Sequence, residues 1–277
     1  MPAIPRRLVA AVLALGVLIG GACSTPTGTT SAARHSPTAK ATSAKVSPKK
    51  QKCKNVPVKA EFHYAKRLLS ADRAFVRKVS KQAISYYAIK TIDCIGRDAV
   101  DVWMDNTEGG KVLAFATYGE IHVFTKSRAW QLAEEPERAQ VLFHEWYHVL
   151  QRTLTPTRAL PLWLVEGSAE WLGFDATVHF GYIDDMDLVR RYLARDAERP
   201  VRPIDKAQSL NPGVYSLYFM GVDFLIHHHG GSARLRQFWK SARPGQSWKK
   251  PFRSVFHVDV APFLKRFEEY RAAGFSE

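Results

Sequence analysis

His144 and His148 stand four residues apart in an apolar stretch that carries the signals of a helix. Pro136 suits the first turn of a helix, and the acidic residues beside it suit a helix N-terminus. Positions i and i+4 share one helical face, so both imidazoles can reach a single ion. The pattern therefore predicts a metal site on a helix that runs to about Thr153. The apolar neighbours in this helix are Val141, Leu142, Phe143, Trp146, Val149 and Leu150.

Glu145 follows the first histidine and completes the pattern HExxH over residues 144–148. A carboxylate at this place points toward the open coordination position, where it can take a proton from the attacking water. A catalytic zinc ion also needs a third protein ligand. The next expected helix, over residues 162–173, offers Glu166 and Glu170 on one face. Either carboxylate is a candidate for the third ligand.

The segment around Glu166 resembles a known family pattern. Residues 163–169 read WLVEGSA, which is similar to the W-L-x-E-G-x-A segment of the gluzincin metallopeptidases, a peptidase MA-like family. The resemblance implies one Zn²⁺ per chain, held by the two histidines and Glu166. It also implies that Glu170 accepts the outer N–H of a ligand histidine. Two alternatives stay open: Glu170 is the ligand and Glu166 supports it, or Glu170 is a solvated helix charge.

The same resemblance adds a tyrosine and a strand to the site. In gluzincins a tyrosine from a later helix stabilises the oxyanion. Tyr215 follows a valine and resembles the V-Y that carries this tyrosine in the aminopeptidase branch. Tyr218 is the alternative, and either tyrosine could instead be an ordinary core residue of this aromatic segment. An edge strand that pairs with an extended peptide is implied at residues 119–124, with Gly119 and Ile121 as substrate-binding residues. The alternative is an ordinary sheet edge.

The activity that this resemblance implies is hydrolysis of a peptide or protein substrate, with Glu145 as the base and Tyr215 at the oxyanion. The G-A-M-E-N segment that recognises a free amino terminus in the aminopeptidases is absent, because residues 114–120 read AFATYGE. An endopeptidase is therefore favoured over an exopeptidase. The alternative from another class is a surface-anchored binding protein that keeps the fold and the metal without cleaving. We expect a monomer.

The order of the expected elements favours an α+β fold. Strand-like patterns cover residues 98–104, 112–117 and 120–125. Helical patterns cover residues 71–89, 136–153, 162–173, 214–229 and 261–273. They predict a gluzincin-like catalytic domain over residues 61–277, with a small mixed sheet. Its α/β part is expected at 61–155 and its helical part at 156–277.

Residues 1–22 have the pattern of an export signal, in which Arg6 and Arg7 precede an apolar run and small residues. Cys23 comes next, and the segment resembles a bacterial lipoprotein signal whose cysteine becomes the lipid-modified first residue. The resemblance implies export and a lipid anchor on the outer face of the cell membrane. Soluble secretion and an uncleaved anchor are the alternatives. Residues 23–60 are rich in Ser, Thr, Pro and Lys and are expected to form a disordered basic linker.

The net charge of the chain indicates possible partners, and its cysteines indicate whether it works in an oxidising compartment. The formal net charge is +14, and part of it lies in the linker. An anionic membrane surface or wall polymer is therefore an expected partner, and a merely solvated linker is the alternative. Nucleic acid is not expected, since the chain is exported and has no such motif. With Cys23 lipidated, Cys53 and Cys94 remain as an expected disulfide, with two free thiols as the alternative.

Overall fold

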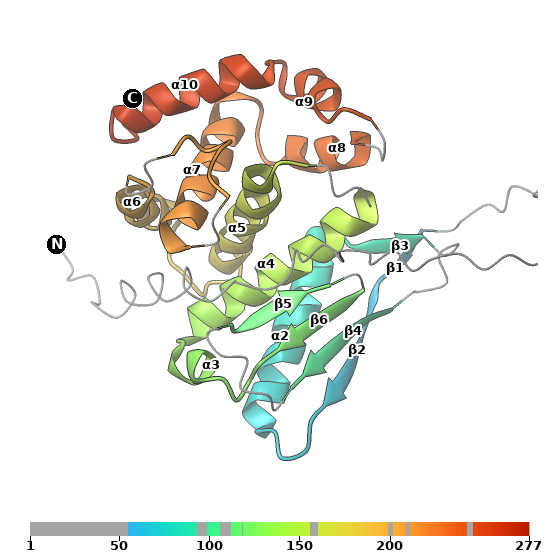
Figure 1. Cartoon of the computed structure of the whole chain (residues 1–277). Coiled ribbons are helices and arrows are strands. Elements are labelled where there is room, and N and C mark those ends of the chain that lie inside the picture. Colours follow the sequence, from blue (N-terminus) through green and yellow to red (C-terminus); the bar gives the residue numbers. More distant parts are fainter. Residues whose placement is uncertain are drawn as a thin grey trace, which may run out of the picture.

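The structure, a computed structural model, describes residues 55–92, 99–105, 112–117, 119–155, 160–198, 202–208, 211–242 and 246–276. Figure 1 shows a small mixed sheet in the N-terminal part, followed by a mostly helical part. The α+β prediction is therefore confirmed. The expected export signal and the three cysteines, Cys23, Cys53 and Cys94, lie outside the described residues. Within the described ranges, no helix is long and apolar enough to cross a bilayer.

Four strands form the main sheet. Their spatial order is β2 (Lys59–Tyr64), β4 (Ala99–Met104), β6 (Glu120–Val123) and β5 (Ala114–Ala116). The first three strands run parallel, and β5 runs antiparallel to β6. A separate pair joins β1 (Asn55–Pro57) to β3 (Lys90–Ile92). Because β1 and β2 begin before residue 61, the expectation of a disordered linker as far as residue 60 is wrong at its end.

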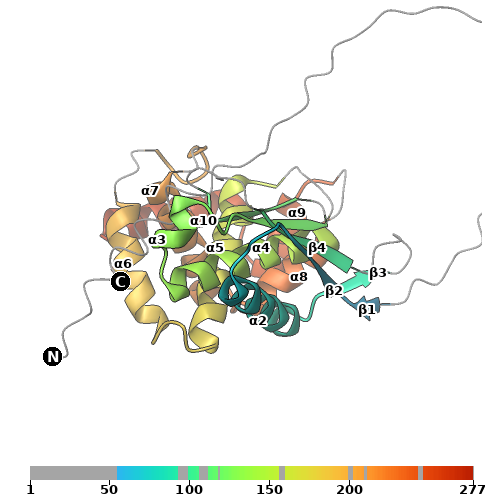
Figure 2. The same ribbon diagram turned by 90° about the horizontal axis from the view of Figure 1, so that it is seen from below.

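Apolar residues alternate along the strands and cover one face of the sheet. Two helices pack on this face, and both lie close to their predicted positions. They are α2 (Ser70–Tyr87) and α4 (Glu135–Leu154). Figure 2 shows α2 lying along the sheet. The buried residues of the two central strands include Val100, Val102, Met104, Ile121 and Val123.

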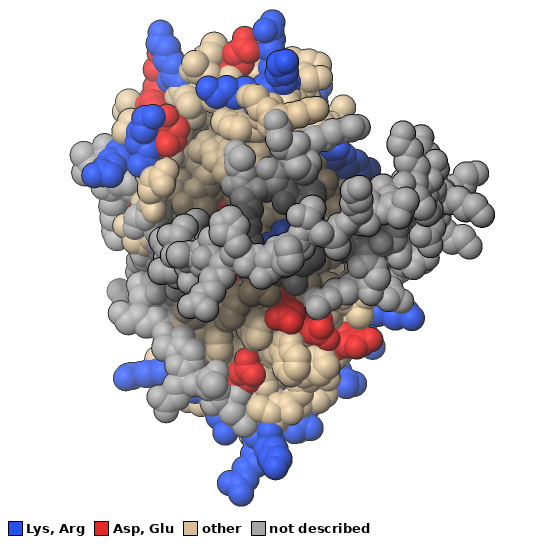
Figure 3. Space-filling view, turned by 45° about the vertical axis from the view of Figure 1, so that its right-hand side comes forward, with Lys and Arg blue, Asp and Glu red and all other residues tan. Residues whose placement is uncertain are grey.

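The opposite face of the sheet is polar and aromatic. A row of rings crosses all four strands in register, namely His63, Trp103, His122 and Phe115. The ring centroids of His63 and Trp103 are 4.0 Å apart, and those of His122 and Phe115 are 4.7 Å apart. Carboxylates flank the row, and Asp101 lies 2.7 Å from His63. Figure 3 shows several acidic side chains close together in the lower half of the view, and Lys and Arg mixed with further acidic side chains near its top.

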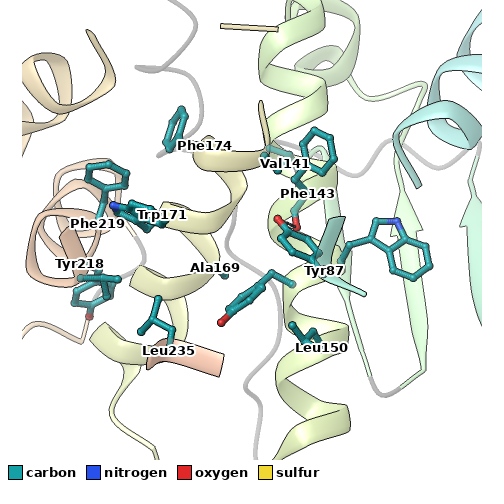
Figure 4. Packing of buried hydrophobic residues seen from close by; sticks show 14 of the residues in the cluster. Tyr87, Val141, Phe143, Leu150, Ala169, Trp171, Phe174, Tyr218, Phe219 and Leu235 are labelled. Atoms are coloured by element: carbon teal, nitrogen blue, oxygen red, sulfur yellow. Dashed lines mark hydrogen bonds between the residues drawn. The ribbon is translucent and has the colours of Figure 1, made fainter. Parts of the chain in front are cut away.

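The helical part is arranged around α5. Its helices are α5 (Leu162–His179), α6 (Met186–Ala197), α7 (Pro212–His228), α8 (Ala233–Ser241), α9 (Lys249–Phe256) and α10 (Val260–Ala272). The sequence pattern predicted α5, α7 and α10, but not the others or the short α3 (Arg128–Leu132). Figure 4 shows α5 between two neighbours: Phe174 faces Phe219 of α7, and Phe143 and Leu150 of α4 lie on the other side.

Two glycines let α5 approach these neighbours. A Cβ atom at Gly167 would lie 2.4 Å from the carbonyl oxygen of Tyr218 and 2.9 Å from Cγ2 of Val222. Glycine is required there, because a larger residue would push α7 away. A Cβ atom at Gly173 would lie 3.3 Å from the backbone nitrogen of His144, which is a milder contact. The helix that carries the two candidate glutamates is therefore held closely by both neighbours.

Candidate metal site

Helix α4 forms where the sequence signals placed it. A capping box begins the helix, and the Glu137 side chain accepts a hydrogen bond of 2.6 Å from the backbone N–H of Glu134. Pro136 lies in the first turn. Every residue from Ala139 to Gln151 is buried. The two histidines therefore belong to a core helix, where a polar group is costly unless it has a partner.

Glu166 of α5 meets the two histidines at one point. Its Oε2 atom lies 3.4 Å from His144 Nε2 and 3.3 Å from His148 Nε2. The two nitrogens are 2.9 Å apart. Donor atoms around a tetrahedral zinc ion lie about 3.3–3.4 Å apart when its bonds are about 2.0–2.1 Å. The spacing of these three atoms therefore suits one shared ion.

The outer nitrogens of the two imidazoles are also bound. His144 Nδ1 lies 2.9 Å from Oε2 of Glu170, and His148 Nδ1 lies 2.7 Å from Oε1 of Gln151. The Gln151 amide nitrogen donates to the carbonyl of Val165 and to the Ser168 hydroxyl, both at 2.9 Å, so its oxygen must face the histidine. Both Nδ1 atoms therefore donate. In the neutral form of each imidazole, the Nε2 lone pair then points inward toward Glu166.

Converging lone pairs in a buried space repel one another unless positive charge lies between them. Burial alone would lower the pKa of His144, but its hydrogen bonds to Glu166 and Glu170 raise the pKa to about 10. Burial alone would raise the pKa of Glu166, but the charge of His148 and the bonds from both imidazoles hold it well below its ordinary range. The site attracts positive charge, and two imidazoles with one carboxylate are ligands that suit Zn²⁺.

Glu145 lies beside these atoms and is 2% exposed. Its carboxylate accepts a hydrogen bond from the backbone N–H of Ala116 in β5. Its Oε1 atom is buried and has no hydrogen-bond partner among the described residues. Burial raises the pKa of Glu145, although the charges of His144 and His148 oppose the rise. A desolvated carboxylate oxygen that accepts no hydrogen bond is suited to accept a proton.

The structure separates the two tyrosine candidates on α7. Asn211 caps the start of α7, and its side chain accepts a hydrogen bond of 3.1 Å from the backbone N–H of Val214. Tyr215 follows in the first turn and makes a side-chain hydrogen bond with Glu166. Burial and the nearby carboxylates raise the pKa of Tyr215 well above its ordinary value, so its hydroxyl stays protonated. The Tyr218 hydroxyl instead donates to the carbonyl of Ala207.

The predicted substrate strand does not lie at a sheet edge. β6 lies between β4 and β5, and Ile121 is fully buried opposite Val102 and Ala116. The Gly119 carbonyl accepts the backbone N–H of Asp101. The expectation that Gly119 and Ile121 offer an open edge is therefore wrong, because the residues before the turn fold back as β5 and cover it.

Sequence reasoning missed Gln151 and Ala116 in this site. Gln151 stands three residues after His148, so its helical spacing was visible. Nothing in its residue type marked it as an acceptor for an imidazole. Ala116 acts through its backbone, which no side-chain pattern reveals.

No family model and no curated protein matches this chain. Among solved structures, an M1 zinc metallopeptidase from Deinococcus radiodurans matches at 15% identity and a TM-score of 0.45, over 81% of this chain and 52% of that one. A mutant of a two-domain M1 zinc metallopeptidase bound to L-arginine matches at 15% identity and a TM-score of 0.46, over 78% and 51%. The chain spans about half the length of these structures.

Proposed function

We propose that this chain is a zinc-dependent hydrolase of peptide bonds, with the ion held by His144, His148 and Glu166. One observation carries the proposal: three ligand atoms converge within 2.9–3.4 Å of one another, while both outer imidazole nitrogens are bound. Such an arrangement supports a metal, and Glu145 beside it supports chemistry on a water molecule. This is the activity that the HExxH pattern predicts.

A bound Zn²⁺ would supply Lewis-acid polarisation of the substrate carbonyl and of the attacking water. Glu145 would take the proton of that water at its free Oε1 atom and later deliver it to the leaving amine. The protonated Tyr215 hydroxyl would donate to the developing oxyanion, since it already lies within reach of Glu166. Burial of these groups strengthens each electrostatic interaction.

Substrate class and location belong to the same proposal. The absence of an amine-recognition segment in residues 114–120 supports an endopeptidase. The signal-like start and Cys23 support an exported protein anchored to the outer face of the membrane, near which the basic linker can meet anionic lipid or wall polymer. Pairing of substrate with Gly119 and Ile121 is not part of the proposal, because β5 occupies that edge.

The test is metal analysis of the purified chain together with cleavage of a mixed peptide library, read by mass spectrometry. We expect one zinc ion per chain and internal cleavage. Glu145→Gln should keep the zinc and abolish cleavage, since glutamine has the shape of glutamate but cannot accept the proton. Loss of zinc in this variant, or retained cleavage, would contradict the assignment. Zinc without cleavage by the unmodified chain would favour the binding-protein alternative.

A further inference from the structure

Arg152 connects the candidate base to the sheet. It lies on α4, seven residues after Glu145, so both side chains leave the helix on nearly the same stripe. Arg152 Nη2 donates a hydrogen bond of 2.9 Å to the carbonyl oxygen of Ala116. The backbone N–H of the same Ala116 donates to the carboxylate of Glu145. Both polar groups of one strand residue are therefore bound by side chains of α4.

The pairing of β5 explains why Ala116 faces α4. The backbone N–H of Thr117 donates to the carbonyl of Glu120, and the carbonyl of Leu113 accepts from Phe124. Alternate residues of a strand direct their backbone groups to opposite sides, so those of Ala116 point away from β6. β5 is three residues long and is the last strand of the sheet order. A strand held on one side needs another contact to fix its distance from α4.

The guanidinium of Arg152 suits this task. A hydrogen bond from a charged donor is stronger than a neutral one, and the half-buried carbonyl of Ala116 would be costly without a donor. The Arg152 side chain is also long enough to reach Ala116. Glu145 and Arg152 lie about 10 Å apart along the axis of α4, and both side chains contact Ala116. If β5 moved away from α4, the Glu145 carboxylate would lose its anchor while the three ligands kept theirs.

We propose that Arg152 is a positioning residue: it holds β5 against α4 so that the Ala116 N–H orients Glu145 with its Oε1 atom toward the open coordination position. This inference rests on the proposed hydrolytic function. It predicts that Arg152 affects the base and leaves metal binding unaffected, because the bonds to both imidazoles come from Glu170 and Gln151. If Arg152 had only a structural role, its loss would lower stability without a specific loss of base function.

The test compares Arg152→Met with Arg152→Lys in the full chain. Methionine keeps the length but removes the donors, whereas lysine keeps one donor for the carbonyl. We expect unchanged zinc content in both variants. Arg152→Met should lower kcat by about 10–100-fold with KM within about 2-fold, and Arg152→Lys should restore most of it. The Ala116 amide should exchange with deuterium faster in Arg152→Met and at about the original rate in Arg152→Lys.

Arg138→Met is the matched control. Arg138 is also half-buried on α4 and also donates to a backbone carbonyl, that of Ala133 at 2.9 Å, but two turns before Glu145. It should lower stability without lowering kcat. Ala116→Pro is a second probe if Arg152→Met fails to fold, because it removes the N–H on the unpaired side of an edge strand, where proline is tolerated. It should reduce kcat in the same way.

Two results would overturn the inference while the proposed function stands. One is cleavage by the unmodified chain with an unchanged Ala116 exchange rate in Arg152→Met. The other is a loss of kcat in Arg152→Met no larger than that in Arg138→Met. A chain that binds zinc and cleaves no peptide would instead remove the proposed function, and the role of Arg152 in positioning a base would fall with it.

Discussion

Replacing Gly167 with alanine tests whether the close contact of α5 with α7 maintains the candidate site. The added Cβ would lie 2.4 Å from the carbonyl oxygen of Tyr218, so α7 would have to move by about 1 Å to reach ordinary contact. Overpacking costs about 1–3 kcal/mol, and a backbone clash belongs at the upper end, about 3 kcal/mol. Alanine regains about 1 kcal/mol of helix propensity. The net loss is about 2 kcal/mol.

Gly173→Ala is the control, since it makes the same exchange in the same helix. Its Cβ would meet atoms of Gln140 and His144 at 3.3 Å, which needs a shift of only a few tenths of an ångström. Overpacking of about 1 kcal/mol and a propensity gain of about 1 kcal/mol then cancel. In thermal unfolding, Gly167→Ala should melt about 4–8 °C below the unmodified chain, and Gly173→Ala within about 2 °C.

The shift of α7 should also move Tyr215 in the candidate site, because Tyr215 lies one turn before Tyr218 on α7. Peptide cleavage by Gly167→Ala should fall more than its loss of stability explains, when it is measured well below the melting temperature. Equal melting temperatures for Gly167→Ala and the unmodified chain would refute the reasoning. A larger loss in Gly173→Ala than in Gly167→Ala would refute it as well.

Three further predictions follow from the site. Glu170→Ala and Gln151→Ala should each weaken zinc affinity by about 10–100-fold in competition with a chelator, because each frees the outer N–H of a ligand histidine; unchanged affinity would contradict the tautomers assigned above. Tyr215→Phe should lower kcat by about 100-fold while Tyr218→Phe changes it little, and the reverse order in steady-state assays would reassign the oxyanion donor. Burial raises the pKa of Glu137 to about 7 in the folded chain, above the pKa of this carboxyl in the unfolded chain. The folded chain therefore loses stability as the pH rises from the unfolded pKa to about 7. Glu137→Gln keeps the capping acceptor, and should therefore raise the urea midpoint at pH 8 but not at pH 4.

Helix α4 could be predicted from sequence because several independent signals agreed there. Pro136, the acidic first turn and the apolar periodicity all indicated α4, and its observed bounds are close to the expected ones. Helix α5 was expected to end at Gly173, but it continues to His179. The glycine there is a packing residue that lets α4 approach, and sequence alone does not separate this use from a helix end.

The strand errors have a different cause. The pattern KAEFHY of β2 mixes charged and aromatic residues, because one face of this strand carries the polar ring row. No strand is therefore predicted there, and the expected linker takes in the first two residues of β2, Lys59 and Ala60. Which of β5 and β6 lies at the edge of the sheet depends on pairing with a strand that is distant in the sequence. Either strand of a hairpin can be the inner one, and only the parallel pairing of β6 with β4 decides it. Gln151 and Ala116 entered the site through such tertiary contacts, so no local pattern marked them.

The three candidate ligands all fall within residues 144–166, on two helices that are neighbours in the chain. The sheet, in contrast, joins strands that are separated by tens of residues. Closing a short loop between two helices costs little chain entropy, whereas pairing distant strands is slow. An ion present during folding would therefore meet its complete ligand set at the stage of a helical hairpin, before the sheet has assembled. The proposed zinc ion would then also stabilise an early folding intermediate, and the rate of folding should increase with the concentration of zinc.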